Sequence, residues 1–377
     1  MRSSASRLRS VFATLLASAL VLGAAAQGHR APPLESPVVH PDRTVTFRLR
    51  ATEALKVELS GQFLPAKLPM QKDEAGLWTI TVGPIEPNLY PYNFVVDGVG
   101  VADPANPDVF PNERFKASLV DIPGETPSLH AVRSVPRGEV TYRFYDSRAL
   151  NRTRPYLVYT PPDYRASGAK YPVLYLVSGT TDTEETWFRA GRVNVILDNL
   201  IAEGKAVPMI VVMPYGNMLS GMPDPNTPQV AAMYRAFCDE LLGEIVPRVE
   251  ADYRIVTDRE HRAIAGFSRG GGQALFTALS HPDKFAWIAS YSAFLTPEVC
   301  ETHFAGFFAR PDETNARLRL LWLGVGRSDF LYQQAVAFEG FLTEKKIEHA
   351  TLVTDGGHTW MNARHYLAET LQRFFKE

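Results

Sequence analysis

The stretch Gly266-Phe267-Ser268-Arg269-Gly270 decides the fold expected for this chain. An apolar run, 262–265, precedes it, and a helix-like stretch, 271–279, follows it. A strand, a tight turn and then a helix is the setting in which the serine of a G-x-S-x-G pentapeptide becomes a nucleophile. Glycine suits both flanking positions, because a side chain there would collide with neighbouring backbone. The pattern predicts Ser268 at the carboxyl end of a strand, with helix N–H groups behind it that stabilise negative charge.

Around this turn, strand-like and helix-like segments alternate from residue 139 to residue 377. The expected strands are Val140–Tyr145, Pro155–Thr160, Pro172–Val177, Met209–Met213, Arg262–Gly266, Trp287–Tyr291, Arg319–Gly324 and Ala350–Val353. The expected helices are Val193–Glu203, Ala231–Ala251, Gly271–Ser280, Leu331–Lys346 and Met361–Phe375. Continuously apolar strands such as 209–213 indicate a sheet covered on both faces. The sequence therefore predicts a doubly wound α/β sheet, in which active sites form at the carboxyl ends of strands.

A different pattern occupies residues 38–122. Short strands with alternating apolar and polar residues, such as 44–50 and 77–82, are separated by turn residues, and no helical periodicity interrupts them. Further strands are expected at 56–60 and 90–96, the latter closed by the hairpin signal Asp97-Gly98. This region is predicted to be a small all-β sandwich. Residues 123–138, rich in Pro, Gly and Ser, are expected to link it to the α/β domain at 139–377.

The first 26 residues are expected to be an export signal. Arg2, Arg7 and Arg9 precede the apolar core 11–23, and Ala24-Ala25-Ala26 forms a small-residue cleavage site. The apolar core is short for a membrane span, so no membrane association is expected after the signal is removed. Loss of the three arginines takes the net charge from −2 to −5. A mildly acidic exported chain without a basic patch is a poor candidate for binding nucleic acid. We therefore expect a periplasmic or extracellular protein.

Cofactor-free chemistry is the simpler expectation. No Cys/His cluster has metal-ligand spacing, and neither a G-x-G-x-x-G motif nor a P-loop is present in the sequence. Cys238 and Cys300 are the two cysteines of the chain. An oxidising compartment would allow them to pair, but Cys238 falls at an apolar position of a helical pattern, which favours a buried free thiol.

A nucleophilic serine needs a general base and a carboxylate that orients the base. His358 follows the last expected strand on a glycine-rich loop, unlike the other downstream histidines, which are His281, His303, His349 and His365. Asp329 follows the strand at 319–324 and completes the chain order Ser…Asp…His of the α/β-hydrolases. An alternative role for Asp329 is to cap the helix that starts near residue 331. Asp355 is the rival carboxylate, better explained as a turn residue.

The oxyanion formed during acyl transfer needs two N–H donors. One is expected to be the backbone N–H of Arg269, the residue after the nucleophile. The other should come from the loop after the third strand, Ser178-Gly179-Thr180-Thr181, with Gly179 or Thr180 as donor. The alternative for this loop is a plain turn.

These residues resemble the esterase family that contains feruloyl esterases of carbohydrate esterase family 1, enterochelin esterases and esterase D. The resemblance rests on the segments 174–179, 194–204 and 208–214, the elbow 266–271, Asp329 and the stretch Gly357-His358-Thr359-Trp360, and it covers 138–377. The segment 90–98, with Asp103-Pro104 and Asn106-Pro107, is similar to the immunoglobulin-like early-set domains that precede such esterases. The family usually has His-Gly where this chain has Ser178-Gly179, and that histidine supports the oxyanion loop.

The resemblance implies an exported serine esterase that releases feruloyl or acetyl groups from plant-type polysaccharide, with a carbohydrate ester or another small ester as substrate. Possible pocket residues are Trp187, Tyr215, Asn217, Met222 and Trp360, although ordinary packing is the alternative for each. Within enzymes the alternatives are a siderophore esterase or an acyltransferase with the same triad. Outside enzymes the alternative is a carbohydrate-binding protein with an inert esterase-like domain.

Overall fold

The computed structural model describes residues 33–218 and 228–376. The chain divides into two compact units, Met1–Glu35 and Ser36–Glu377, according to which residues contact one another. All helices and strands described below lie in the second unit. The expected export signal, residues 1–26, lies outside the described residues, as does Met222. Within the described ranges, no helix is both long and apolar enough to cross a membrane.

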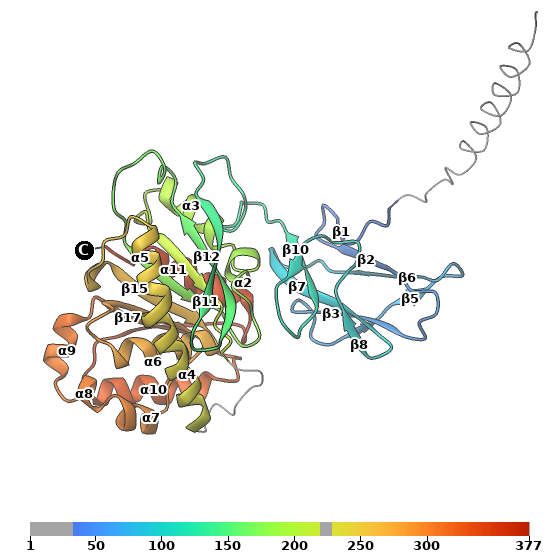
Figure 1. Cartoon of the computed structure of the whole chain (residues 1–377). Helices are drawn as coiled ribbons and strands as arrows, with labels where there is room; N and C mark the ends of the chain where they lie inside the picture. The colour runs from blue at the N-terminus through green and yellow to red at the C-terminus, as the bar shows by residue number, and fades with distance from the viewer. Residues whose placement is uncertain (1–32, 219–227, 377) are drawn as a thin grey trace, which may run out of the picture. The chain divides into compact units, whose positions relative to one another are not determined.

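Short antiparallel strands form two sheets in the N-terminal part of the described chain (Figure 1). One sheet has the order β1-β2-β6-β5 and the other β4-β3-β7-β10-β9, with β8 paired to β7. The strands are β1 Val38–Val39, β2 Val45–Arg50, β3 Val57–Gly61, β4 Leu68–Pro69, β5 Gln71–Lys72, β6 Leu77–Val82, β7 Asn88–Val96, β8 Val99–Val101, β9 Val109–Phe110 and β10 Ala117–Ile122. The expected hairpin at Asp97-Gly98 joins β7 to β8, and both turn residues have positive φ.

The two sheets enclose one core, as alternation in the strands predicts. Phe47 and Tyr92 are fully buried in it and lie 4.7 Å apart between ring centroids. The N-terminal region is therefore an all-β sandwich.

Eight strands of the described chain form the sheet of the α/β domain, in the order β11-β12-β14-β13-β15-β16-β17-β18. They are β11 Glu139–Ser147, β12 Arg152–Thr160, β13 Val173–Val177, β14 Ile210–Pro214, β15 Arg262–Phe267, β16 Trp287–Tyr291, β17 Leu320–Gly326 and β18 Ala350–Thr354. β11, β12 and β14 pair antiparallel, and β14, β13 and the strands from β15 to β18 pair parallel. All eight expected strands are present with small shifts at their ends, so this is the predicted doubly wound sheet.

Helices cover both faces of this sheet (Figure 1). The helices are α2 Thr186–Arg189, α3 Val193–Ala202, α4 Pro228–Glu240, α5 Val246–Asp252, α6 Arg269–Ser280, α7 Pro297–His303, α8 Ala305–Phe308, α9 Pro311–Arg317, α10 Tyr332–Glu344 and α11 Trp360–Leu371. In β13, Val173, Tyr175 and Val177 join the core under α4, α5, α6 and α10, whereas Leu174 and Leu176 join the core under α3 and α11. A strand apolar at every position thus serves two cores.

The expected helix 231–251 differs from the observed one. In place of one continuous α-helix, the structure has α4, then a π-helical turn, Leu241–Ile245, and then α5, which has a proline in its first turn. A π turn shifts the phase of the helix without ending it. The short helices α2, α7, α8 and α9 have too few turns to show a hydrophobic period in the sequence.

A buried arginine of α11 joins the α/β domain to the sandwich. Arg364 is 4% exposed and donates to the backbone carbonyl of Leu89 at 2.7 Å and to the side-chain oxygen of Asn88 at 2.8 Å, both in β7. It also donates to the carbonyl of Ala190. Burial lowers the pKa of Arg364 to about 10. No carboxylate among the described residues bonds this guanidinium, so three oxygens from two domains satisfy it instead.

Candidate active site

Ser268 lies at the tight turn between β15 and α6. Its φ of 54° and ψ of −128° fall outside the regions that side-chain-bearing residues normally occupy. The turn is close-packed: a Cβ at Gly266 would lie 2.4 Å from the backbone of Gly270, and one at Gly270 would lie 2.4 Å from the carbonyl oxygens of Val177 and Ser178. The two glycines therefore let the elbow close and bring it against the carboxyl end of β13.

The structure brings Ser268, His358 and Asp329 together at the carboxyl ends of parallel strands. The Ser268 Oγ is 2.8 Å from His358 Nε2. His358 Nδ1 is 3.0 Å from Asp329 Oδ2 and 3.1 Å from Oδ1. With the proton on Nδ1 donated to the carboxylate, Nε2 is free to accept the serine proton.

Two aromatic rings contact the imidazole of His358. The ring of Phe267 stacks on it at 4.8 Å between centroids, and the ring of Phe330 lies at 4.6 Å. Phe267 is buried, whereas Phe330 is 75% exposed. An exposed phenylalanine beside the base is positioned to contact a bound acyl group or its alcohol. Phe330 is not among the site residues expected from the sequence, although its place directly after Asp329 is a usable signal.

Asp329 is a buried carboxylate. Burial opposes its ionisation, but the hydrogen bond and the charge of His358, together with other hydrogen bonds such as that from the Leu331 N–H, bring the pKa of Asp329 below its usual value. Its Oδ1 also accepts the backbone N–H of Leu331 at 2.9 Å, just before α10. Asp329 thus orients the histidine but does not cap α10, because the N-cap residue of that helix is Leu331 and no side chain caps it. The rival Asp355 is exposed, and His358 bonds Asp329 instead.

The loop after β13 lies against the nucleophile. A Cβ on Gly179 would be 3.4 Å from the Cβ of Ser268 and 2.9 Å from Oδ2 of Asp182. The backbone N–H of Gly179 donates to that carboxylate oxygen at 3.1 Å. Of the two expected oxyanion donors in this loop, Gly179 is therefore occupied, and Thr180 is the candidate. Arg269, the first residue of α6, has its backbone N–H at the helix N-terminus, where intrahelical partners are lacking.

Asp182 is a carboxylate beside the site that no sequence motif predicts. It is 5% exposed, and burial raises its pKa to about 7, although hydrogen bonds from Asn112 and Gly179 and the charge of Arg269 act in the opposite direction. Its backbone oxygen accepts the side-chain amide of Asn217 at 3.0 Å. By contrast, the hydroxyl of Ser178, 2% exposed, has no hydrogen-bond partner among the described residues. The loop is held by Asp182 and Asn217, not by Ser178.

The suggested pocket residues are mostly packing residues. Trp187 is fully buried and donates from Nε1 to the carbonyl of Val177 at 2.9 Å. Trp360 is 4% exposed and stacks edge-on against Trp187, with 4.8 Å between centroids. Asn217 is 3% exposed and holds the loop. These three side chains cannot line a substrate pocket in this conformation, because neighbouring side chains cover them.

Tyr215 is the exception among these residues. It is partly exposed, its hydroxyl donates to the carboxylate of Glu113 in the sandwich, and the guanidinium of Arg154 lies over its ring at 5.0 Å. Tyr215 thus connects the two domains close to the loop after β13.

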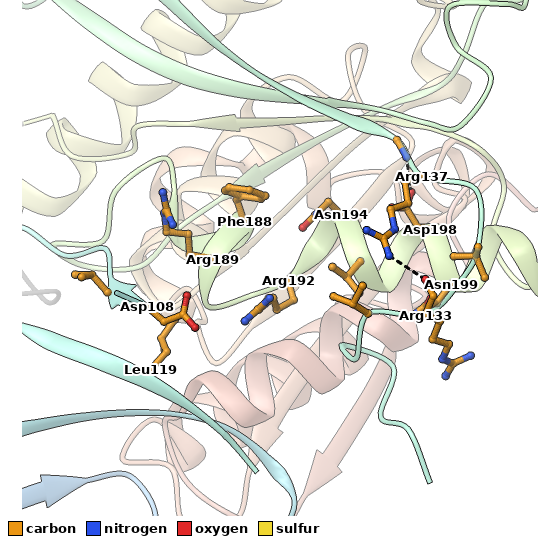
Figure 2. Close-up of a pocket in the computed structure, with 15 residues that line it drawn as sticks. Asp108, Leu119, Arg133, Arg137, Phe188, Arg189, Arg192, Asn194, Asp198 and Asn199 are labelled. Carbon is orange, nitrogen blue, oxygen red and sulfur yellow. Dashed lines mark hydrogen bonds between the residues drawn. The ribbon is translucent and has the colours of Figure 1, made fainter. Parts of the chain in front are cut away.

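A hollow of about 260 Å³ lies elsewhere, between the sandwich, the linker, α2 and α3 (Figure 2). Its lining includes the arginines Arg133, Arg137, Arg189 and Arg192. Figure 2 shows that these side chains do not converge on one point. Arg133 pairs with Glu203, and Arg189 pairs with Glu185 at 3.1 Å. No triad residue lines the hollow, so it is separate from the candidate active site.

Cys238 and Cys300 are both buried free thiols. Burial raises their pKa to about 11 and about 12, respectively. Inert, buried cysteines of this kind behave as small apolar residues.

The strand order and the elbow define the class of protein as an α/β-hydrolase with a Ser–His–Asp constellation. Residues 147–374 match the Esterase family, described as "Putative esterase", and the chain belongs to this family. The family expected from the sequence is thereby confirmed.

Similar proteins carry related names. An endo-1,4-beta-xylanase/feruloyl esterase of Xylanibacter ruminicola is 27% identical over 360 residues, which cover 92% of this chain and 46% of that protein. The chain thus spans less than half the length of this relative. The solved CE1 ferulic acid esterase of Anaeromyces mucronatus is 25% identical with a TM-score of 0.56, and the match covers 66% of this chain and 96% of that one. The enterobactin esterase of Shigella flexneri shares the fold over 88% of this chain and 92% of that one, with a TM-score of 0.64 at 18% identity.

Proposed function

We propose that this chain is a serine carboxylic ester hydrolase that removes feruloyl or acetyl groups from a plant-type polysaccharide. The observation that carries the proposal is the continuous hydrogen-bonded line from the Ser268 hydroxyl through the His358 ring to the Asp329 carboxylate, at 2.8 Å and 3.0 Å. Family membership supports an ester as substrate. The names of the relatives, feruloyl esterase and xylanase, support the acyl group and the polysaccharide.

Acylation begins when Ser268 Oγ attacks the ester carbonyl carbon while His358 Nε2 takes the hydroxyl proton. The oxyanion that forms accepts hydrogen bonds from the backbone N–H groups of Arg269 and Thr180. The intermediate then collapses: the bond between the acyl carbon and the alcohol oxygen breaks, and that oxygen takes the proton from Nε2. The alcohol, here a sugar hydroxyl, leaves, and the acyl group stays on Ser268.

Deacylation repeats these steps with water as the nucleophile. His358 Nε2 takes a proton from water as its oxygen attacks the acyl carbon, and the same two N–H groups hold the second oxyanion. Breaking the bond to Ser268 Oγ releases the carboxylic acid, and the serine recovers its proton from Nε2. Asp329 keeps the imidazole in one tautomer throughout and stabilises its transient positive charge.

The triad is tested with Ser268→Ala and a chromogenic short-chain ester. We expect turnover to fall at least ~10³-fold with the melting temperature within a few degrees of the wild type. Ser134→Ala is the matched control, since Ser134 is exposed in the linker. Turnover by Ser268→Ala at the wild-type rate would contradict the proposal.

The substrate is tested with methyl ferulate, acetylated xylan, aryl acetates and a cyclic siderophore trilactone. Fastest release from feruloylated or acetylated xylan supports the proposed substrate. Fastest cleavage of the trilactone would instead select a siderophore esterase, to which the fold shared with the enterobactin esterase lends support. Binding of xylan without turnover of any ester would select a non-catalytic carbohydrate-binding protein.

We further propose that the chain is exported, because residues 1–26 have the charged start, apolar core and small-residue site of a signal peptide. N-terminal sequencing of the protein from a bacterial periplasm should begin at or near Gln27. A mature protein that still begins at Met1 would contradict export by this signal.

A further inference from the structure

The carboxylate of Asp182 has no part in the triad chemistry, yet it lies beside it. It is 5% exposed, so its two oxygens depend on protein donors. Oδ2 accepts the backbone N–H of Gly179 at 3.1 Å, and Oδ1 accepts the side-chain amide of Asn112 at 2.8 Å. One carboxylate thus connects the loop after β13 to the sandwich.

Gly179 is the point where this connection meets the nucleophile. The glycine lies so close to Ser268 that a Cβ on it would be 3.4 Å from the serine Cβ. Thr180, the proposed oxyanion donor, is the next residue. The Thr180 N–H shares a peptide plane with the carbonyl of Gly179, and this carbonyl accepts the backbone N–H of Asp182 at 3.3 Å. Asp182 therefore holds Gly179 on both sides, through its carboxylate and its backbone, and restricts the direction of the Thr180 N–H.

Asn112 is itself fixed within the sandwich. Its Oδ1 accepts the backbone N–H groups of Arg114 at 2.9 Å and of Phe115 at 2.7 Å, which orients its amide nitrogen toward Asp182. This tight turn lies between β9 and β10, the last two strands of the sandwich. Asn112 therefore presents a preorganised donor to the α/β domain.

Two further hydrogen bonds join the same segments on either side of this contact. The backbone N–H of Glu113 donates to the carbonyl of Thr181 at 2.8 Å. The Thr186 hydroxyl donates to the carbonyl of Pro111 at 2.7 Å. The sandwich residues 111–113 thus lie alongside residues 181–186, which run from the loop into the first residue of α2, and Asn112 pairs with Asp182 as an isolated antiparallel bridge.

We propose that Asn112 and Asp182 are positioning residues for the oxyanion hole, so that the N-terminal sandwich is a working part of the esterase. This inference rests on the proposed ester hydrolysis. Asn112 orients the carboxylate, the carboxylate holds Gly179, and Gly179 sets the N–H of Thr180 against the developing oxyanion. The contribution is absent from the bound ester, because the oxyanion forms only in the tetrahedral intermediate and the transition states on either side of it.

The test uses three variants of the full chain and a chromogenic ester. Asn112→Ala removes the donor to Asp182. In Asp182→Asn, the new amide oxygen can accept from Gly179 or from Asn112 but not from both, because its other end is a donor. Since removing an oxyanion donor costs ~10²–10³ in kcat, a misdirected donor should cost roughly 10–10²-fold, with KM changed less than about threefold.

The third variant exchanges the two residues: Asn112→Asp together with Asp182→Asn. The carboxylate at 112 still accepts from Arg114 and Phe115 and now also accepts from the amide at 182, whose oxygen accepts from Gly179. Every hydrogen bond has a donor and an acceptor again, although the charge has moved to the sandwich. We expect the double variant to regain most of the kcat that each single variant loses, since the pair is coupled.

Asn88→Ala is the matched control, because Asn88 also joins the sandwich to the α/β domain, at Arg364. It should lower the melting temperature and leave kcat within about twofold. Wild-type kcat in Asn112→Ala, absence of rescue in the exchanged pair, or an equal loss in Asn88→Ala would each overturn the inference. Failure of the proposed function is distinguishable, because Ser268→Ala would then match the wild type.

Discussion

The close approach of α6 to the end of β13 predicts a large effect from one added methyl group, Gly270→Ala. The new Cβ would lie 2.4 Å from the carbonyl oxygens of Val177 and Ser178, whereas ordinary contacts begin near 3.4 Å. The overlap is about 1 Å, and both atoms are backbone, so no side-chain rotation relieves it. The end of β13 must move away from the elbow that carries Ser268.

Two opposing effects set the change in the free energy of unfolding. Overpacking of a close-packed site costs about 1–3 kcal/mol. Replacing glycine by alanine within a helix stabilises by roughly 1 kcal/mol, which offsets part of that cost. The net loss should therefore be roughly 0–2 kcal/mol. The effect on turnover is larger: displacement of the oxyanion loop by about 1 Å should lower kcat ~10²-fold, equivalent to roughly 2.7 kcal/mol in the barrier.

The assay pairs thermal unfolding with turnover of a chromogenic ester. Gly340→Ala is the control, since Gly340 lies within α10 and a Cβ there meets nothing within 4 Å. That variant should be slightly more stable than the wild type and fully active. If Gly270→Ala kept the kcat of the wild type, the close contact between α6 and β13 would not limit the geometry of the site.

Three other predictions concern the base, its neighbours and the thiols. Asp329→Asn should lower kcat by ~10⁴ because the imidazole of His358 is no longer held in one tautomer. Since the folded-state pKa of Asp329 is lowered, its contribution to the free energy of unfolding is present above its unfolded pKa and is lost as pH falls through the folded value. Urea titrations should therefore show that the variant loses less stability than the wild type at acid pH. Phe330→Ala should change KM for aromatic esters at least threefold and stability by less than about 0.5 kcal/mol, because the ring is 75% exposed; an unchanged KM would exclude contact with substrate. Burial raises the pKa values of Cys238 and Cys300 to about 11 and about 12, so both thiols should resist iodoacetamide at pH 8 in the folded protein and react after unfolding. Mass spectrometry measures the labelling, and rapid labelling of the native protein would contradict their burial.

The sheet of the α/β domain could be predicted because each strand carries its own signal. Met209 to Met213 are apolar at every position, which only a strand buried on both faces explains, and β14 lies there. The sandwich was predicted less completely. Strands of two residues, such as β4 and β5, carry no alternation that a sequence pattern can show. Their formation depends on pairing with longer neighbours.

The meeting of Ser268, Asp329 and His358 could also be predicted, since all three follow strands and the carboxyl ends of parallel strands share an edge. The role of Trp187 could not be predicted from the sequence. Its full burial depends on how α2 packs over the sheet, a tertiary fact without a local signal. The same holds for the pair Asn112 and Asp182, which meet across two domains.

The junction at Arg364 bears on how such proteins diverge. Its guanidinium takes two of its acceptors from β7, so a fragment cut in the linker would leave a buried cation short of both partners. Loss or exchange of the sandwich during evolution should therefore require a compensating substitution at position 364. In descendants that keep this arginine, the two domains are expected to be inherited together.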